Sequence, residues 1–188
     1  MSQMYEEAKE IVWKVAAYTG IQTGPLCMQF FYQPQKGIQV CECAGRIFGY
    51  EHELVTYGSG LSLEELLLDY VYEEEQLKQK LERHNPFAFR NVAGLYFHGF
   101  EGAKVRDYEE AEKVIQKLGA LDTLFYYQPG ETVTHGVGAK PYVFRIFIGA
   151  ENREELDRIT GCYYEELRVP EESGKNLLYA SQMKEYGI

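Results

Sequence analysis

Residues 26–46 read LCMQFFYQPQKGIQVCECAGR, and this stretch decides the fold into which the rest of the chain must fit. Apolar and aromatic residues dominate its first half, and an alternating apolar pattern returns in its second half. Between the halves, residues 34–37 (Pro-Gln-Lys-Gly) are typical of a turn. The pattern predicts an antiparallel hairpin of residues 26–33 and 38–43. Its first strand is apolar enough that we expect cover on both faces.

The loop length of this hairpin sets which side chains face one another. A four-residue loop, residues 34–37, would bring Gln29 opposite Glu42 on one face, with Ala44 and then Arg46 following on that face. The other face would carry apolar side chains suited to packing on helices: Met28, Phe30, Cys41 and Cys43. The hairpin therefore predicts one core face and one polar face.

The polar face joins an amide oxygen, a carboxylate and a guanidinium. Oxygen donors from Gln29 and Glu42 could hold a Mg²⁺ ion that also takes phosphate oxygens. Arg46 could neutralise a transferring phosphoryl group or a substrate carboxylate. The alternative is a surface ion pair between Glu42 and Arg46, with Gln29 merely polar. A one-residue error in loop length would exchange the two faces, so spacing alone leaves both interpretations open.

Composition excludes several classes of partner. The chain has 188 residues, 45% of them hydrophobic and 26% charged, which is typical of a globular protein with a core. Nineteen Lys and Arg against 29 Asp and Glu give a net charge of −10. Nucleic-acid grooves and anionic membrane surfaces need concentrated positive charge, so we expect neither partner. No apolar run of about 18 residues and no basic or apolar leader occurs, which predicts a cytoplasmic protein.

The remaining segments predict an α+β fold with mainly antiparallel sheets and flanking helices. Expected helices are residues 4–18, a segment opened by Ser62 with Glu65 as a capping box, 73–83, a segment from Asp107 to 118, and 154–167 capped by Asn152. Expected strands are residues 92–100, 102–106, 121–128 and 142–148, followed by a polar tail from 169. We place a boundary between domains of residues 1–85 and 86–188.

Cysteine and histidine give weaker signals. The four cysteines show no disulfide spacing, and Cys41 with Cys43 on one strand face is more typical of packing than of a metal site. His52, which lies between two glutamates, could contact a substrate or act as a base, although a surface loop histidine is the default interpretation. The other histidines lack the spacing of zinc ligands.

Several motifs, in order, resemble the distal half of the ATP-grasp carboxylate–amine ligases, such as biotin carboxylase and carbamoyl-phosphate synthase. Residues 20–30 (GIQTGPLCMQF) are similar to a glycine lead followed by a strand with an acidic residue or Gln. Residues 41–49 (CECAGRIFG) are similar to a strand end of the form E-x-N-x-R followed by glycine. Segments 60–66, 127–131 and 145–156 resemble later parts of the family's C-terminal lobe.

The resemblance implies an ATP and Mg²⁺ site, with Gln29 and Glu42 as metal and cofactor ligands. Arg46 would be a cofactor-binding and catalytic residue. In this family ATP phosphorylates a carboxylate, and an amine then attacks the acyl phosphate. Two departures bear on the site: Ala44 stands where the family has Asn, and Gln29 stands where many relatives have Glu.

The family also has an N-terminal domain and a small lobe that supplies lysines and a Gly-rich loop over the phosphates. We find no counterpart of these parts in this sequence. The resemblance therefore predicts the C-terminal portion of a ligase, incomplete on its own and completed by a separately encoded or removed N-terminal half. The alternative is a degenerate, non-catalytic binding protein that covers its aromatic surface by forming a homodimer.

Overall fold

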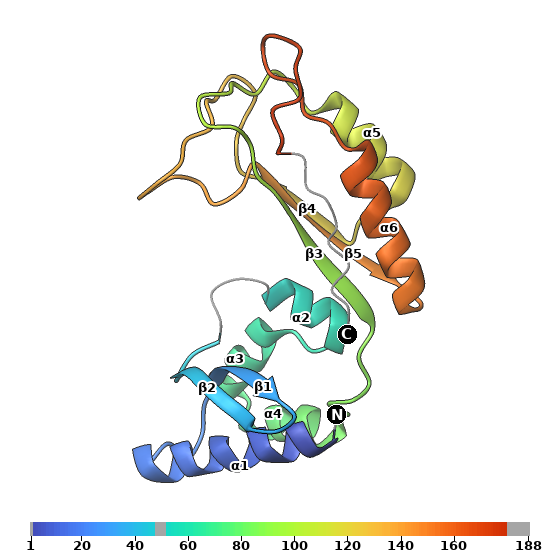
Figure 1. Ribbon diagram of the computed structural model, residues 1–188. Coiled ribbons are helices and arrows are strands. Elements are labelled where there is room, and N and C mark those ends of the chain that lie inside the picture. Colours follow the sequence, from blue (N-terminus) through green and yellow to red (C-terminus); the bar gives the residue numbers. More distant parts are fainter. Residues whose placement is uncertain (1, 48–51, 180–188) are drawn as a thin grey trace. The chain divides into compact units, whose positions relative to one another are not determined.

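The computed structural model describes residues 2–47 and 52–179 (Figure 1). The chain divides into two compact units. The first unit comprises Met1–Thr56 and Gly60–Pro86, and the second comprises Tyr57–Ser59 and Phe87–Ile188. No helix within the described ranges combines the length and the apolar character that are needed to cross a membrane.

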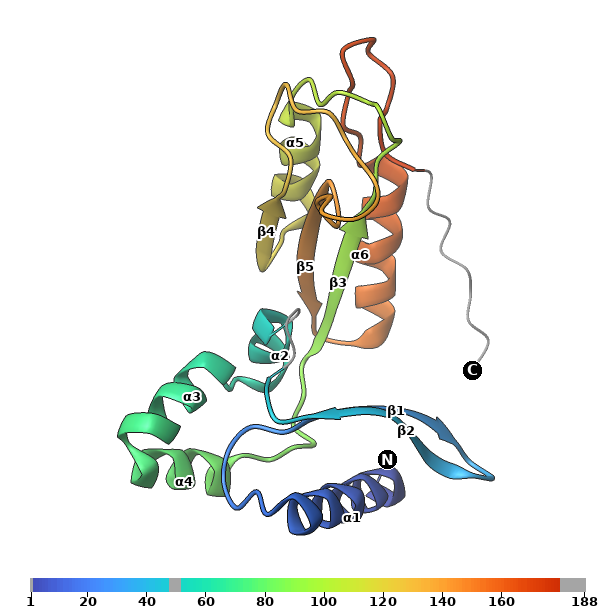
Figure 2. The same cartoon turned by 90° about the vertical axis from the view of Figure 1, so that its left-hand side faces the viewer.

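The first unit is built from helices around a two-stranded antiparallel hairpin. Its elements are α1 (Ser2–Thr19), β1 (Cys27–Gln33), β2 (Gly37–Ala44), most of α2 (His52–Ser59), α3 (Leu63–Tyr72) and α4 (Glu74–Arg83). The hairpin contacts α1 through β2, and Figure 2 shows the two side by side. The side-chain oxygen of Ser62 accepts a hydrogen bond from the Glu65 N–H, which confirms the predicted cap of α3.

Helix α2 was not predicted, because the sequence after Arg46 was interpreted only as a stretch interrupted by glycines, Gly49, Gly58 and Gly60. Gly58 instead lies inside the helix. A Cβ atom at this position would come within 2.4 Å of the Phe89 ring, so only glycine allows the close packing seen there. The preceding residues 48–51, including the Gly49 of the family-like motif, lie outside the described part of the chain.

The second unit packs two helices against a three-stranded antiparallel sheet of order β3-β5-β4. Its elements are β3 (Asn91–Phe97), α5 (Glu109–Leu118), β4 (Asp122–Phe125), β5 (Phe144–Ala150) and α6 (Arg153–Glu166). The Asn152 side chain accepts a hydrogen bond from Glu155 N–H and caps α6, as predicted. Together the two units confirm the α+β class with antiparallel pairing.

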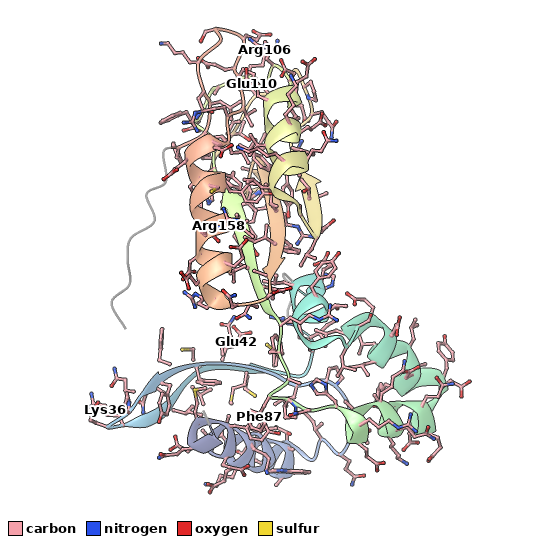
Figure 3. All side chains as sticks on the ribbon, turned by 90° about the vertical axis from the view of Figure 1, so that its right-hand side faces the viewer. Lys36, Glu42, Phe87, Arg106, Glu110 and Arg158 are labelled. Atoms are coloured by element: carbon pink, nitrogen blue, oxygen red, sulfur yellow. The ribbon has the colours of Figure 1, made fainter. Side chains whose placement is uncertain are left out.

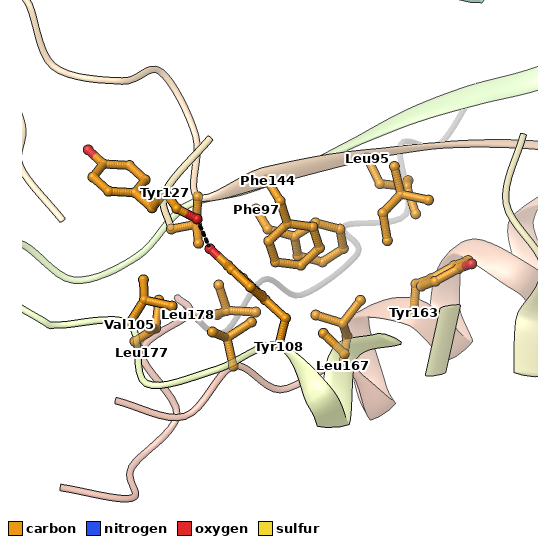
Figure 4. Packing of buried hydrophobic residues seen from close by; sticks show 14 of the residues in the cluster. Leu95, Phe97, Val105, Tyr108, Tyr127, Phe144, Tyr163, Leu167, Leu177 and Leu178 are labelled. Atoms are coloured by element: carbon orange, nitrogen blue, oxygen red, sulfur yellow. Dashed lines mark hydrogen bonds between the residues drawn. The ribbon is translucent and has the colours of Figure 1, made fainter. Parts of the chain in front are cut away.

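The hydrophobic core of the second unit is aromatic (Figure 4). The rings of Phe97 and Phe144 stack with their centroids 4.7 Å apart, and Tyr163 packs in the same cluster. The Tyr108 hydroxyl donates a hydrogen bond to the Tyr127 carbonyl oxygen at 2.8 Å. Burial raises the pKa of Tyr163 to about 12 and raises the pKa of Tyr108 further, because the charged phenolate is poorly solvated in the core.

Three details of the second unit differ from expectation. The strand predicted for residues 102–106 is absent, because Lys104 and Val105 form only isolated bridges, with Thr132 and Glu171. Helix α5 begins at Glu109 rather than next to Asp107, although the Asp107 carboxylate still accepts a hydrogen bond from the Glu109 N–H. The tail from residue 169 was predicted to be polar, but Val169 and Leu177 are buried in the core. Leu178 forms an antiparallel bridge with Gly99, so backbone pairing to a distant strand end fixes this segment.

The first unit has no comparable core. Among its described residues no hydrophobic side chain is buried, and the apolar ones are half-buried or exposed. The prediction that the first hairpin strand is covered on both faces is therefore wrong. Phe31 of that strand is 70% exposed, and Trp13 of α1 is 68% exposed.

Candidate functional site

The hairpin of the first unit brings Gln29 of β1 opposite Glu42 of β2. Both residues are exposed and, because facing residues of an antiparallel pair point to the same side, both side chains lie on one face of the hairpin. Figure 3 labels Glu42 on the hairpin and Lys36 at its turn. The pairing predicted for these two positions is confirmed.

The route to this pairing differs from the prediction. The turn holds only residues 34–36, so that Gln33 pairs with Gly37 rather than with Ile38. The Lys36 N–H closes the turn by donating to the Gln33 carbonyl oxygen at 2.9 Å. The register then shifts between Gln29 and Phe30 by a bulge, which restores the expected pairing beyond it.

The bulge also changes the opposite face of the hairpin. Cys41 is the surplus residue with no partner in β1, and it is exposed. Phe30 pairs with Val40, and Met28 pairs with Cys43. The predicted apolar face is therefore correct for Met28, Phe30 and Cys43, whereas Val40 occupies the place expected for Cys41.

Arg46 follows the end of β2 and turns back toward Glu42. One of its terminal nitrogens, Nη2, lies 3.3 Å from Glu42 Oε1, and Nη1 donates to the Ile47 carbonyl oxygen at 3.1 Å. The Arg46 side chain is 57% exposed and that of Glu42 52% exposed. The surface ion pair considered as the alternative is therefore present. An exposed pair of this kind contributes about 0–1 kcal/mol, so a bound anion or metal can replace it at little cost.

A cavity of about 780 Å³ opens beside Arg46 within the first unit. Its walls are the segment 22–27, Arg46 with Ile47, and the facing sides of α3 and α4. Gln29 and Glu42 do not line it. Sequence reasoning missed this cavity because four separate segments form it. Its only signal was the leucine stripe of α3, which by itself predicts core packing.

The donor set on the hairpin suits a shared metal site. The described residues hold no group of three or more His, Cys, Asp or Glu side chains arranged to bind a metal ion alone. Gln29 and Glu42 instead offer an amide oxygen and a carboxylate on one exposed face. Mg²⁺ usually keeps several waters and takes one or two protein oxygens together with substrate phosphates. These two residues therefore fit a Mg²⁺ ion that arrives with a nucleotide.

His52 has a local structural role. It is the first residue of α2 rather than a loop residue, and its Nδ1 contacts the Glu64 carboxylate of α3. Its Nε2 lies 3.6 Å from Glu53 Oε2. Both ring nitrogens therefore have carboxylate neighbours within the first unit.

Comparisons with known proteins support the fold. No family model matches the sequence, and no curated protein matches it in sequence. Among solved structures, the L-amino acid ligase from Bacillus licheniformis aligns with a TM-score of 0.66 and 16% identity, covering 90% of this chain and 41% of that one. The phosphoribosylaminoimidazole carboxylase ATPase subunit from Aquifex aeolicus aligns with a TM-score of 0.55 and 16% identity, covering 86% of this chain and 43% of that one.

Both neighbours are ATP-grasp enzymes, so the chain has the fold of part of an ATP-grasp enzyme. The predicted resemblance is confirmed at the level of the fold. The chain spans about two-fifths of the length of either neighbour. An identity of 16% supports the shared fold and leaves the activity to be argued from the site.

Proposed function

We propose that this chain is the C-terminal portion of an ATP-grasp ligase and supplies protein ligands for Mg²⁺-ATP during formation of an acyl phosphate. The observation that carries the proposal is the pairing of Gln29 with Glu42, with Arg46 in contact with Glu42, in a chain that folds as part of an ATP-grasp enzyme. A separately encoded or removed N-terminal half would supply the remaining nucleotide contacts, and the chain alone would not be a complete enzyme.

Each of the three residues has a distinct role in this proposal. Glu42 would give a charged oxygen and Gln29 a neutral oxygen to the metal, which when bound supplies charge neutralisation at the phosphates. Arg46 would leave Glu42 and donate hydrogen bonds to the oxygen atoms between which negative charge moves. A guanidinium group is suited to electrostatic stabilisation of an anion rather than to proton transfer.

Ala44 limits how tightly this site can hold a nucleotide. The residue lies between Glu42 and Arg46 and has no polar side-chain atom where the family places an Asn. One oxygen ligand is therefore missing from the hairpin. We expect weaker metal binding than in family members that keep the Asn.

A paramagnetic metal tests the proposal directly. We expect Mn²⁺-ATP at millimolar concentration to broaden the NMR signals of the Gln29 side-chain amide, because Mn²⁺ substitutes for Mg²⁺ at oxygen sites. The variant Glu42→Gln should abolish the broadening. Glu6→Gln is the matched control, since Glu6 is another exposed carboxylate of the first unit with a cationic partner, Lys9.

The N-terminal half gives the second arm of this test. The reading frame upstream of this gene should encode a lysine-bearing lobe, and its product mixed with this chain should show ATP-dependent acyl transfer. An absence of selective broadening in the isolated chain, together with an absence of activity in the mixture, would contradict the proposal.

The exposed apolar side chains of the first unit favour a second candidate, a non-catalytic protein that dimerises. Trp13, Tyr18 and Phe31 are all more than half exposed, and large exposed apolar surfaces usually meet another protein. Light scattering distinguishes the two candidates. A stable homodimer that fails to bind nucleotide would favour assembly, whereas a monomer that binds Mn²⁺-ATP through Glu42 would favour the ligase.

A further inference from the structure

We propose that the cavity beside Arg46 binds a carboxylic acid with an apolar body, and that Arg46 receives its carboxylate. We call this the Arg46 cavity and define it by Leu26, Arg46, Ile47, Leu66, Tyr70 and Leu77. The inference rests on the proposed function, in which a carboxylate is the group that becomes phosphorylated. It adds the class of acid, which neither the fold nor the hairpin residues specify.

The size and walls of the Arg46 cavity suit a small organic molecule. Its volume of about 780 Å³ falls within the range of about 300–1,000 Å³ usual for such sites. Leucines from α3 and α4, together with Leu26 and Ile47, form most of the wall, and their side chains are half-buried or exposed. An apolar ligand would therefore gain free energy by covering surface that this unit leaves in water.

A few polar groups interrupt the apolar wall. The Thr23 Oγ1 and Tyr70 hydroxyl oxygens lie 3.3 Å apart and pair with each other. On α4, the Lys78 ammonium lies 3.1 Å from a Glu74 oxygen and 3.2 Å from a Glu75 oxygen, so two carboxylates already neutralise it. Neither pair offers an uncompensated charge to a ligand.

Arg46 differs from Lys78 in the number of N–H donors that its partners leave free to bind a ligand. Its guanidinium carries five N–H donors, and its side chain contacts one exposed carboxylate and one backbone carbonyl oxygen. Donors therefore remain for a bidentate interaction with a ligand carboxylate, which is the geometry that guanidinium groups favour. An amine or a neutral head group would gain no such interaction at Arg46.

The position of Arg46 connects the cavity to the proposed reaction. Arg46 lines the cavity and also contacts Glu42, which does not line it. An acid whose body fills the cavity would thus place its carboxylate next to the hairpin edge where the nucleotide is proposed to bind. This continuity favours an acid substrate over an unrelated apolar ligand.

Calorimetric titration of the full chain with alkyl carboxylates tests the proposal without any nucleotide. We expect octanoate to bind. Each methylene removed, as in hexanoate, should weaken binding about two- to fourfold, and each methylene added, as in decanoate, should strengthen binding by the same factor. Octylamine and octanol, which keep the alkyl chain but change the head group, should bind at least about tenfold more weakly than octanoate.

Variants assign the binding to the cavity. Arg46→Gln should weaken octanoate binding by at least about tenfold, and it should fold normally because Arg46 is exposed. Leu66→Ser should reduce the gain from longer chains while leaving the preference for a carboxylate. Arg83→Gln is the matched control, because Arg83 is an exposed cation of α4 that does not line the cavity. Circular dichroism should match the unmodified chain in each case.

Two outcomes would overturn the proposal: no octanoate binding at millimolar concentration, or equal binding of octanoate, octylamine and octanol. Equal binding would show that the cavity is a general apolar surface of the kind a protein partner covers. Octanoate binding that depends on Arg46, with neither Mn²⁺-ATP broadening at Gln29 nor activity in the mixture with the N-terminal half, would leave this inference standing and contradict the proposed function. The reverse result would reject only the carboxylate site.

Discussion

Phe144 and Ile146 in the second unit have no solvent-exposed surface, whereas Phe30 and Leu66 in the first unit remain only half-buried. The two units contain comparable secondary structure, and both have capped helices and an antiparallel sheet. They differ in whether apolar side chains find cover within the same unit. Local structure is therefore complete in both units, but a core is complete in only one.

This difference indicates where the chain depends on other molecules. Ordering each residue costs about 1–2 kcal/mol of conformational entropy, and burial of apolar surface is the main term that offsets it. The second unit can meet this cost from its own core. The first unit, with half-covered leucines around the Arg46 cavity, gains stability from anything that covers them, such as a ligand or a missing half.

Truncation of a core side chain should give the largest difference in stability between the two units. Phe144→Ala should lower the free energy of unfolding of the second unit by about 3–5 kcal/mol, since it removes a fully buried ring. Leu67→Ala in the first unit should cost about 1 kcal/mol or less, because Leu67 is only partly covered. Hydrogen-exchange mass spectrometry in urea reports each unit separately through its own peptides.

A milder variant keeps this test interpretable if Phe144→Ala does not fold. Ile146→Val removes one methyl group from the same core and should cost about 0.5–1.5 kcal/mol. If Leu67→Ala destabilised its unit as much as Phe144→Ala does, the first unit would have a core of its own and the contrast drawn here would be wrong.

Helix caps offer a matched pair of smaller changes. Asn152→Ala removes the cap of α6, and Ser62→Ala removes the cap of α3. Each should lower the free energy of unfolding by about 1 kcal/mol. We expect the loss at Asn152 to speed amide exchange throughout the second unit, because its elements share one hydrophobic core. The loss at Ser62 should be confined to the first turn of α3.

Substitution by Asp keeps an acceptor oxygen at either cap and serves as the control. Amide exchange measured by NMR separates the two cases. Faster exchange in β1 and β2 after Ser62→Ala would show that the first unit is cooperative, contrary to the comparison.

The smallest expected effects are on the pH dependence of stability, at acid pH for the second unit and at alkaline pH for the first. Hydrogen bonds from Lys140 and from the Gln128 N–H lower the pKa of Glu131 in the second unit. Its contribution to stability is therefore present above its ordinary pKa of 4.5 and is lost as the pH falls through the lowered value. Glu131→Gln should make the stability of the second unit less sensitive to acid.

In the first unit the sign is reversed. The hydrogen bond to Asp69 raises the pKa of Lys80, so this pair contributes below the ordinary value of 10.5 and is lost as the pH rises through the raised value. Lys80→Met should make the first unit less sensitive to alkali, as followed by exchange rates at matched denaturant. Equal alkaline sensitivity of the variant and the unmodified chain would contradict this assignment.

Local signals in the sequence predicted most elements, and the errors have physical causes. Ser62 and Asn152 were identified as caps because their side chains act within three residues. The buried tail at Val169 and Leu177 was missed because its cover comes from distant strands, and alternation over so short a segment is weak. Helix α2 was missed because its glycine, Gly58, weakens the helical pattern, although in the fold it allows a close contact with Phe89.

The candidate site was predictable in its residues but not in its surroundings. Gln29 and Glu42 were paired correctly from strand spacing, yet the shorter turn and the compensating bulge leave no local signature. The ion pair between Glu42 and Arg46 was one of two interpretations that spacing allowed, and the structure contains it. The Arg46 cavity depends on segments that meet only in the folded unit, so no single stretch of sequence reveals it.

Cys41 is the extra residue of the β-bulge, and the bulge shifts the register of the hairpin by one residue. Between the turn and Cys41, the even-numbered Val40 of β2 lies opposite Phe30. Beyond Cys41, the odd-numbered Cys43 lies opposite Met28 on that same face. If the ladder continued past Val40 without the bulge, Cys41 would pair with Gln29, and Glu42 would lie opposite Met28 on the other face of the hairpin. The bulge at Cys41 therefore determines which side chains share the polar face, although Cys41 itself pairs with no residue of β1.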